Sequence, residues 1–207
     1  MTYQELLKRF SGDPLIDGTQ LLPFYESIPA LRVQVARWVK SGKLIKLRSN
    51  VFLLPPRQAG VQVFPSAVAA RLLSPSYLST HTALQYHGLI PEAVFAFTSV
   101  TSKRANTFTN VLGKFVYQHI RKDLFWGYSA IVQDGQTAFM AEPEKAVLDL
   151  FHLRGQRVTP EYLAELRLQN PRALSRRKLR ESADKFRLGF MRDAAEMLIT
   201  CLKGLCP

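Results

Sequence analysis

The sequence predicts an α+β fold built in two parts. Apolar residues recur at helical spacing as far as residue 40 and then alternate over residues 43–54, which indicates helices followed by a β-hairpin. Pro and Gly in residues 55–60 have the composition of a linker. We therefore expect one domain over residues 1–56 and a second, mixed α/β domain over residues 57–207. The second domain should contain a small antiparallel-rich sheet and end in a helical segment of about 156–207.

The first domain is expected to hold helices and one hairpin. A first helix fits residues 2–10, where apolar side chains fall on one face. Residues 15–26 are ambiguous: a second short helix is plausible there, but Pro23 limits its length. A third helix is expected over residues 27–40. Ser49-Asn50 then lies between two alternating runs, which is typical of a tight hairpin turn.

The second domain is expected to change from helices to strands and back. Two helices should come first, over residues 65–73 and 79–87. Strands follow where apolar residues alternate: Val94, Phe95, Phe97 and Val100, then Val111, Phe115, Val116 and Tyr117, then residues 125–132 and 137–141. Asp134-Gly135 predicts a hairpin between the last two. Helices should close the chain over about 142–153, 160–168, 173–187 and 190–203.

The charge of the chain points to a polyanionic partner. Its 207 residues carry 28 Lys and Arg against 16 Asp and Glu, a net charge of +12. Residues 27–91 contain no acidic residue, and the predicted helix and hairpin within them carry Arg32, Arg37, Lys40, Lys43, Lys46 and Arg48. Cations near phosphates release condensed counterions and so give affinity independent of sequence. The alternative is a basic surface that contacts only solvent.

The third helix and the hairpin have the pattern of a winged helix-turn-helix DNA-binding domain. An apolar stripe of Ile28, Leu31, Val35, Trp38 and Val39 would pack on a core. The opposite face carries Ala30, Val33, Arg37 and Lys40, with Arg32 and Gln34 on its flanks. We expect Arg32, Val33, Gln34, Arg37 and Lys40 to face a major groove. Lys43, Lys46 and Arg48 should contact phosphates, and strand alternation predicts Lys46 and Arg48 on one face.

A second nucleic-acid surface is possible near the C-terminus. The densest basic run comprises Arg172, Arg176, Arg177, Lys178 and Arg180. Lys103, Arg104 and Lys114 would widen it if the sheet packs beside that helix. The alternative is a solvated helix face, which is the usual explanation for such a run.

Other chemistry is not indicated. His81, His87, His119 and His152 are too dispersed for a shared zinc site, so we expect neither a metal nor a cofactor. No catalytic arrangement or Gly-rich phosphate loop is recognisable. Cys201 and Cys206 are expected to be reduced thiols in a cytoplasmic protein. The polar, amphipathic start is not a signal peptide, and no apolar run approaches the roughly 20 residues that span a bilayer.

Several segments resemble the AbiE-type (type IV) antitoxins. Residues 37–48 are similar to the helix-into-wing passage of that family, and residues 76–84 and 87–89 to its second-domain signature. Residues 98–103 and 141–150 also match the family, so the resemblance covers about residues 20 to 155. One departure lies in the wing turn, where the family usually has Gly followed by a strand with an aromatic residue, and this chain has Asn50-Val51-Phe52.

The resemblance implies an antitoxin that represses its own operon. Its N-terminal domain would bind operator DNA, and its second domain would counter a nucleotidyltransferase-like toxin without a stable complex. Operators are commonly inverted repeats, so a dimer on DNA is expected. Most of the apolar stripe of the last helix should be core, and part of it would be available for pairing two protomers: Phe190, Met191, Ala194, Ala195, Leu198, Ile199 and Leu202. Two alternatives stay open: a stand-alone winged-helix transcription factor with a sensing or dimerisation domain, and an enzyme acting on nucleic acid.

Overall fold

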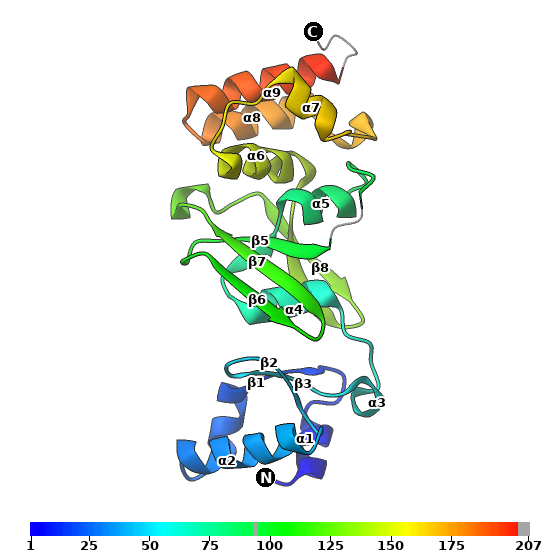
Figure 1. Ribbon diagram of the computed structural model, residues 1–207, viewed down its shortest axis with the longest axis vertical. Coiled ribbons are helices and arrows are strands. Elements are labelled where there is room, and N and C mark those ends of the chain that lie inside the picture. The colour runs from blue at the N-terminus through cyan, green and yellow to red at the C-terminus, as the bar shows by residue number, and fades with distance from the viewer. Residues whose placement is uncertain (93–94, 203–207) are drawn as a thin grey trace.

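Over the residues that the structure describes, the chain has a mixed α+β architecture with one three-stranded and one six-stranded sheet. The computed structural model describes residues 1–92 and 95–202. The molecule is elongated, with the N-terminal unit at one end, the larger sheet in the middle and the last three helices at the other end (Figure 1). We refer to residues 1–54 as the first unit and to the remainder as the larger unit.

The first unit contains two α-helices, a 3₁₀ helix and three strands. Its elements are α1 (Tyr3–Arg9), β1 (Leu15–Asp17), η1 (Gly18–Phe24), α2 (Ile28–Lys40), β2 (Ile45–Arg48) and β3 (Val51–Leu53). The predicted first and third helices and the hairpin are confirmed. The ambiguous residues 15–26 form a strand and a 3₁₀ helix, in which Asp17 caps η1 by accepting hydrogen bonds from the N–H and hydroxyl of Thr19 at 2.8 and 2.7 Å.

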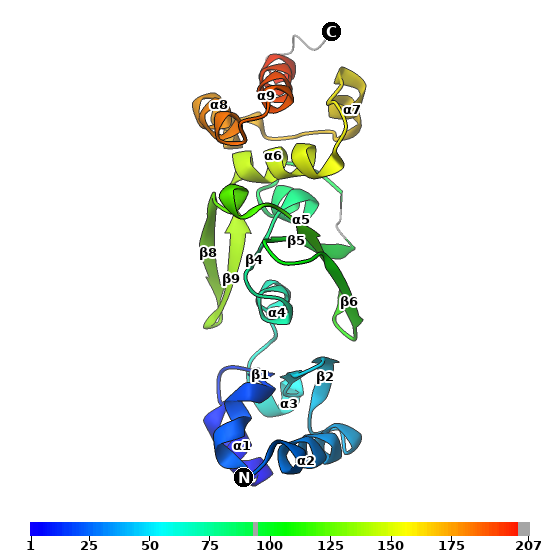
Figure 2. The ribbon, with the colours of Figure 1, turned by 90° about the vertical axis from the view of Figure 1, so that its left-hand side faces the viewer.

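The three-stranded sheet has the order β1-β3-β2, with both pairs antiparallel. Its side chains divide between two hydrophobic clusters. Ile16 and Phe52 pack with α1 and α2, in a cluster drawn from residues 6–54. Leu15, Leu47, Val51 and Leu53 belong instead to the core of the larger unit. The sheet is therefore sandwiched between the helices of the first unit and the larger unit (Figure 2).

The larger unit is built on a mixed sheet of order β6-β7-β5-β4-β9-β8. Its strands are β4 (Ser76–Leu78), β5 (Ala96–Thr101), β6 (Asn106–Asn110), β7 (Gly113–His119), β8 (Tyr128–Gln133) and β9 (Gln136–Ala141). Three of the five strand pairs are antiparallel and two are parallel. The predicted Asp134-Gly135 turn is confirmed, because it joins β8 to β9 with both residues at positive φ.

The helices of the larger unit lie around and beyond this sheet. They are α3 (Pro56–Ala59), α4 (Pro65–Leu72), α5 (Thr80–Tyr86), η2 (Lys122–Leu124), α6 (Pro143–Arg154), α7 (Pro160–Glu165), η3 (Pro171–Ala173), α8 (Arg176–Lys185) and α9 (Gly189–Cys201). The predicted linker thus contains a short helix, α3. Helix α6 separates the sheet from α7, α8 and α9 (Figures 1 and 2).

Two strands of the larger unit were not predicted. β4 is central but has only three residues, all buried, so it shows no alternation. β6 is a polar edge strand in which Phe108 is the one large apolar residue. Val111, predicted within a strand, lies instead in the turn between β6 and β7 and is 73% exposed.

The last helix confirms one expectation, and its cysteine corrects another. Met191, Ala194, Ala195, Leu198 and Ile199 are buried within the chain, so most of the apolar stripe serves as core, as expected. Cys201 is disulfide-bonded and the expected reduced thiol is wrong there. The same expectation for Cys206, the strand residue Val94 and the expected helix end at 203 lie outside the described residues.

Candidate nucleic-acid interface

Helix α2 is held to the first unit along one face. The Ser27 hydroxyl accepts a hydrogen bond from the Ala30 N–H at 3.4 Å and so caps the helix. Leu31, Val35 and Trp38 are buried, and the Trp38 ring lies 5.9 Å from that of Tyr3 in α1. This packing fixes the helix and leaves its other faces accessible.

The predicted apolar stripe of α2 is too wide at its N-terminal end. Ile28 is 54% exposed, although its spacing placed it with the buried residues. It occupies the first turn of α2, ahead of Leu31, which is the first buried residue of the helix. Val39 is half-buried. Both side chains border the groove described below.

Five of the six clustered cations are exposed on the first unit. They are Arg32, Arg37, Lys40, Lys43 and Lys46. None of them makes an ion pair within residues 1–92 and 95–202. Val33, at 51% exposure, lies among them, and Gln34 is half-buried. An accessible helix face and the start of the hairpin therefore present uncompensated positive charge.

Arg48 does not join this group. The strand register shifts between Lys46 and Arg48, which indicates a β-bulge, so the two side chains do not share a face as simple alternation predicts. Lys46 borders the groove beside α2, whereas the Arg48 guanidinium lies 5.6 Å from the ring of Phe108 in β6. Arg48 is half-buried at the junction of the two units, and its Nε makes no hydrogen bond in the described chain.

The hairpin turn is anchored to the first unit. Asn50 adopts a φ of +63°, as the turn requires, and its carbonyl accepts a hydrogen bond from the Gly18 N–H at 2.8 Å. A Cβ on Gly18 would come within 2.8 Å of the Asn50 Oδ1, so only glycine fits against the turn without displacement. The hairpin is consequently short and fixed beside η1.

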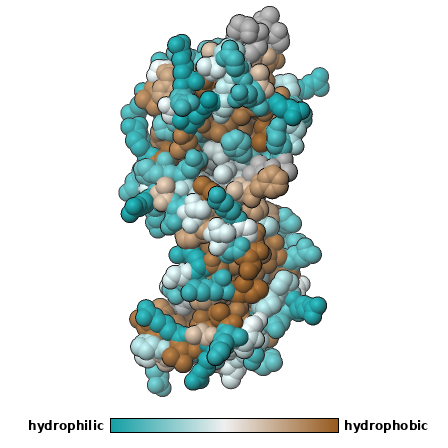
Figure 3. Space-filling view, viewed as in Figure 1, coloured by the Kyte–Doolittle hydropathy of each residue, from teal (hydrophilic) through white to brown (hydrophobic). Residues whose placement is uncertain are grey.

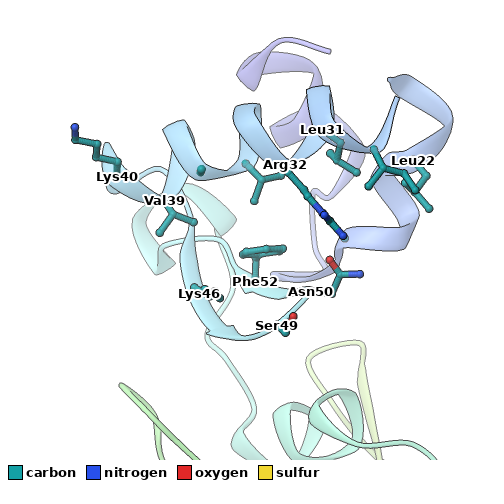
Figure 4. A pocket seen from close by; sticks show the side chains of 13 residues that line it. Leu22, Leu31, Arg32, Val39, Lys40, Lys46, Ser49, Asn50 and Phe52 are labelled. Carbon is teal, nitrogen blue, oxygen red and sulfur yellow. The ribbon is translucent and has the colours of Figure 1, made fainter. Parts of the chain in front are cut away.

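A groove of about 550 Å³ separates α2 from the hairpin. Apolar side chains that line it include Leu22, Ile28, Val39 and Phe52, while Arg32 and Lys46 supply charge. In Figure 4, Arg32 reaches from α2 toward Asn50, Phe52 lies between the helix and the turn, and Lys40 points away. Because the pattern of exposed and buried positions alone does not reveal a concave surface, the sequence did not predict this groove. We call it the α2–hairpin groove.

The second predicted basic surface is divided. Arg177, Lys178 and Arg180 pair with Glu181, Glu142 and Glu196, respectively, whereas Arg172 and Arg176 make no ion pair in the described part of the chain. Lys103 and Arg104 follow β5, and Lys114 lies on β7, near the β6 edge of the sheet. Figure 2 shows α8 and β6 on opposite sides of the molecule, so the structure does not bring these two groups together.

A buried polar cluster in the larger unit was also not predicted. Lys145 and Asp149, one turn apart on α6, form an ion pair at 1% and 0% exposure. Asp149 also accepts hydrogen bonds from the hydroxyls of Tyr77 at 2.9 Å and Ser79 at 2.8 Å. The Lys145 ammonium lies 4.8 Å from the ring centre of Trp126. The only sequence signal was a Lys and an Asp at i, i+4 inside an apolar helix.

Burial dominates the electrostatics of this cluster. It lowers the pKa of Lys145 and raises those of Asp149 and Tyr77, while the ion pair opposes the first two shifts. Burial likewise lowers the pKa of His152 on the next turn. The residues could form a proton-transfer chain, but Ser79, Lys145 and Asp149 are sealed from solvent. Their geometry is that of a structural connection between α6 and β4.

Three further searches, for metal sites and membrane-spanning helices in the described residues and for similar protein families or curated proteins, gave no match. No group of three His, Cys, Asp or Glu side chains among residues 1–92 and 95–202 is arranged to hold a metal ion. Within the same residues, no helix has the length and hydrophobicity needed to cross a bilayer. No protein-family model matches the chain, and no curated protein matches it.

Proposed function

We propose that the first unit is a winged helix-turn-helix domain that binds double-stranded operator DNA. The order α1-β1-η1-α2-β2-β3 and the sheet order β1-β3-β2 support this assignment. η1 and α2 are separated by three residues, 25–27, which is the connection length of a helix-turn-helix. In this arrangement α2 is the recognition helix and the hairpin is the wing.

The observation that carries the proposal is the unpaired charge of the first unit. Arg32, Arg37, Lys40, Lys43 and Lys46 are exposed without a counterion in the described chain, and no acidic residue lies between them in the sequence. A duplex would supply the missing negative charge. α2 contributes Arg37 and Val33 to base edges, and the lysines contact phosphates. Arg48 is left out of this interface because it lies at the junction.

We further propose that the protein is an antitoxin that represses its own operon. This assignment depends on a resemblance to the AbiE-type antitoxins, carried by residues 37–48, 76–84, 87–89, 98–103 and 141–150. The partner would be a nucleotidyltransferase-like toxin, countered by the larger unit without a stable complex. A dimer on inverted repeats would match the two-fold symmetry of such operators.

A salt series tests DNA binding. The full chain is titrated against its own upstream DNA in a band-shift assay at several salt concentrations, as wild type, Lys46→Ala and Arg48→Ala. We expect Lys46→Ala to reduce the slope of log K against log salt by about one unit, because one phosphate contact is lost. Arg48→Ala, from the same strand, should leave the slope unchanged. Equal slopes for wild type and Lys46→Ala would remove Lys46 from the interface, and absence of binding would overturn the proposal.

Rescue from a toxin tests the antitoxin assignment. The full chain is co-expressed with a nucleotidyltransferase-like toxin encoded beside it, and growth is measured for wild type and for the double variant Arg37→Ala/Lys40→Ala. We expect both to restore growth, with repression lost only in the double variant. DNA binding without rescue would instead indicate a stand-alone transcription factor. Point variants are preferable to deletion of residues 1–56, because deletion would remove Leu47 and Val51 from the core of the larger unit.

A further inference from the structure

The α2–hairpin groove has a chemistry that DNA binding does not explain. Its walls include Leu22 and Ile28, which are 39% and 54% exposed although both are large and apolar. Phe52 is buried against the core and forms the floor of the groove (Figure 4). A phosphate backbone can pair with the cations, but it has no apolar surface that would pack against Leu22 and Ile28. The groove therefore presents apolar surface that the proposed duplex would leave without a partner.

The charged groups of the groove all have the same sign. Arg32 extends into it from α2, and Lys46 borders it from β2, while Lys40 borders it but points away. None of these three cations makes an ion pair in residues 1–92 and 95–202, and none of the described residues that line the groove carries a carboxylate. A ligand complementary to this surface combines an apolar body with one negative charge. The volume of about 550 Å³ lies within the range of small-molecule sites.

We propose that the groove binds a small amphiphilic anion, a carboxylate or sulfonate attached to an aliphatic chain or aromatic ring. The apolar body lies on Phe52 and between Leu22 and Ile28, and the anionic group pairs with Arg32. The same ligand competes with DNA, because it occupies the space between the recognition helix and the wing and neutralises Arg32. This second statement rests on the proposed function, whereas the binding site itself does not.

Two alanines on α2 give a matched test of the site. Ala36 lines the groove and Ala30 does not, and both are exposed. Binding of decanoate to the full chain is measured by its displacement of the fluorescent sulfonate 1-anilinonaphthalene-8-sulfonate. We expect saturable binding that Ala36→Trp weakens at least tenfold by filling the groove, whereas Ala30→Trp leaves it within twofold of wild type. Equal affinities for the two tryptophan variants would overturn the site.

The role of the charge is tested separately. Arg32→Gln should weaken decanoate binding at least fivefold and leave binding of the neutral analogue decanol unchanged. If decanol displaced the dye from the wild-type protein with the same affinity as decanoate, the site would not be specific for an anion. Arg32→Gln also replaces Ala36→Trp if thermal unfolding shows that the larger substitution disturbs the fold.

Competition with DNA completes the test. Decanoate at ten times its Kd for wild type should raise the apparent Kd for the upstream duplex about tenfold in wild type. In Ala36→Trp, the same concentration should change the apparent Kd by less than twofold from the value that this variant has without decanoate, whatever effect the tryptophan itself has on duplex binding. If decanoate and duplex bind independently, the regulatory part of the proposal is wrong while the site stands. If the chain binds decanoate but no duplex, the proposed function fails and the site is judged by the displacement data alone.

Discussion

Arg37 is the residue from which base selectivity is most directly expected. It is exposed on α2 and is not held by any carboxylate of the described chain. Its guanidinium can therefore donate two parallel hydrogen bonds to a guanine edge without first breaking an intramolecular pair. The same freedom would allow a phosphate contact, which carries no sequence information.

The variant Arg37→Ala distinguishes these two contacts. If Arg37 makes a bidentate contact with a base, the substitution should weaken binding to the preferred sequence by about 1–3 kcal/mol and relax selectivity at one position. The measurement is a set of Kd values for duplexes that differ by single base pairs. Arg37→Lys is the control, since it keeps the charge but not the planar fork. Uniform weakening across all duplexes would mean that Arg37 touches only phosphate.

Single residues also show where sequence patterns are insufficient. Alternation placed Lys46 and Arg48 together, but one bulge turned Arg48 toward Phe108 of the larger unit. Helical spacing placed Ile28 in the core, but α2 starts before the core begins to cover it. Periodicity predicts which way a side chain points from an ideal helix or strand. A bulge changes that direction, and at the end of an element the side chain can point to solvent instead of to the core.

At the scale of elements, prediction succeeded where capping and turn residues were explicit. The helix expected over residues 27–40 is α2, which Ser27 caps, and Asp134-Gly135 joins β8 to β9 as expected. Prediction failed for β4, which is too short and too buried to alternate, and was ambiguous for residues 15–26. Such segments take their conformation from strands and helices distant in the sequence, which a local pattern does not contain.

Helix α6 offers a prediction about stability. Asp149→Ala would leave the Lys145 charge buried without a counterion, and the Tyr77 and Ser79 hydroxyls without their acceptor. We expect the free energy of unfolding to fall by about 3–5 kcal/mol, measured by urea denaturation. The cost should come mainly from the unpaired charge rather than from lost packing.

A double variant separates these two causes. Lys145→Met/Asp149→Asn removes both charges, fills the space among the aromatic rings and keeps an oxygen that accepts from Ser79. It should be clearly more stable than Asp149→Ala. Equal instability of the two variants would show that lost packing, not the isolated ammonium, dominates.

At the scale of the whole molecule, the junction of the units decides how the chain unfolds. Leu47 and Val51 of the hairpin are buried in the core of the larger unit, and the Asn110 amide donates to the Leu47 carbonyl at 3.4 Å. Arg71 of α4 pairs with Asp13 at 2.8 Å. On the face shown in Figure 3, hydrophobic surface gathers around this junction. These contacts couple two units that composition alone predicted to be separate domains.

The chain should therefore unfold in one cooperative transition. Its two tryptophans report on different units, Trp38 on the first and Trp126 on the larger one, and each can be followed in a background where the other is Phe. Leu6→Ala, a change in the core of the first unit, should cost about 2–5 kcal/mol and shift the urea midpoint seen by Trp126 as much as that seen by Trp38. Leu198→Ala in α9 should do the same from the opposite end. If Leu6→Ala shifted only the urea midpoint seen by Trp38, the two units would unfold independently, and the contacts at the junction would be too weak to couple them.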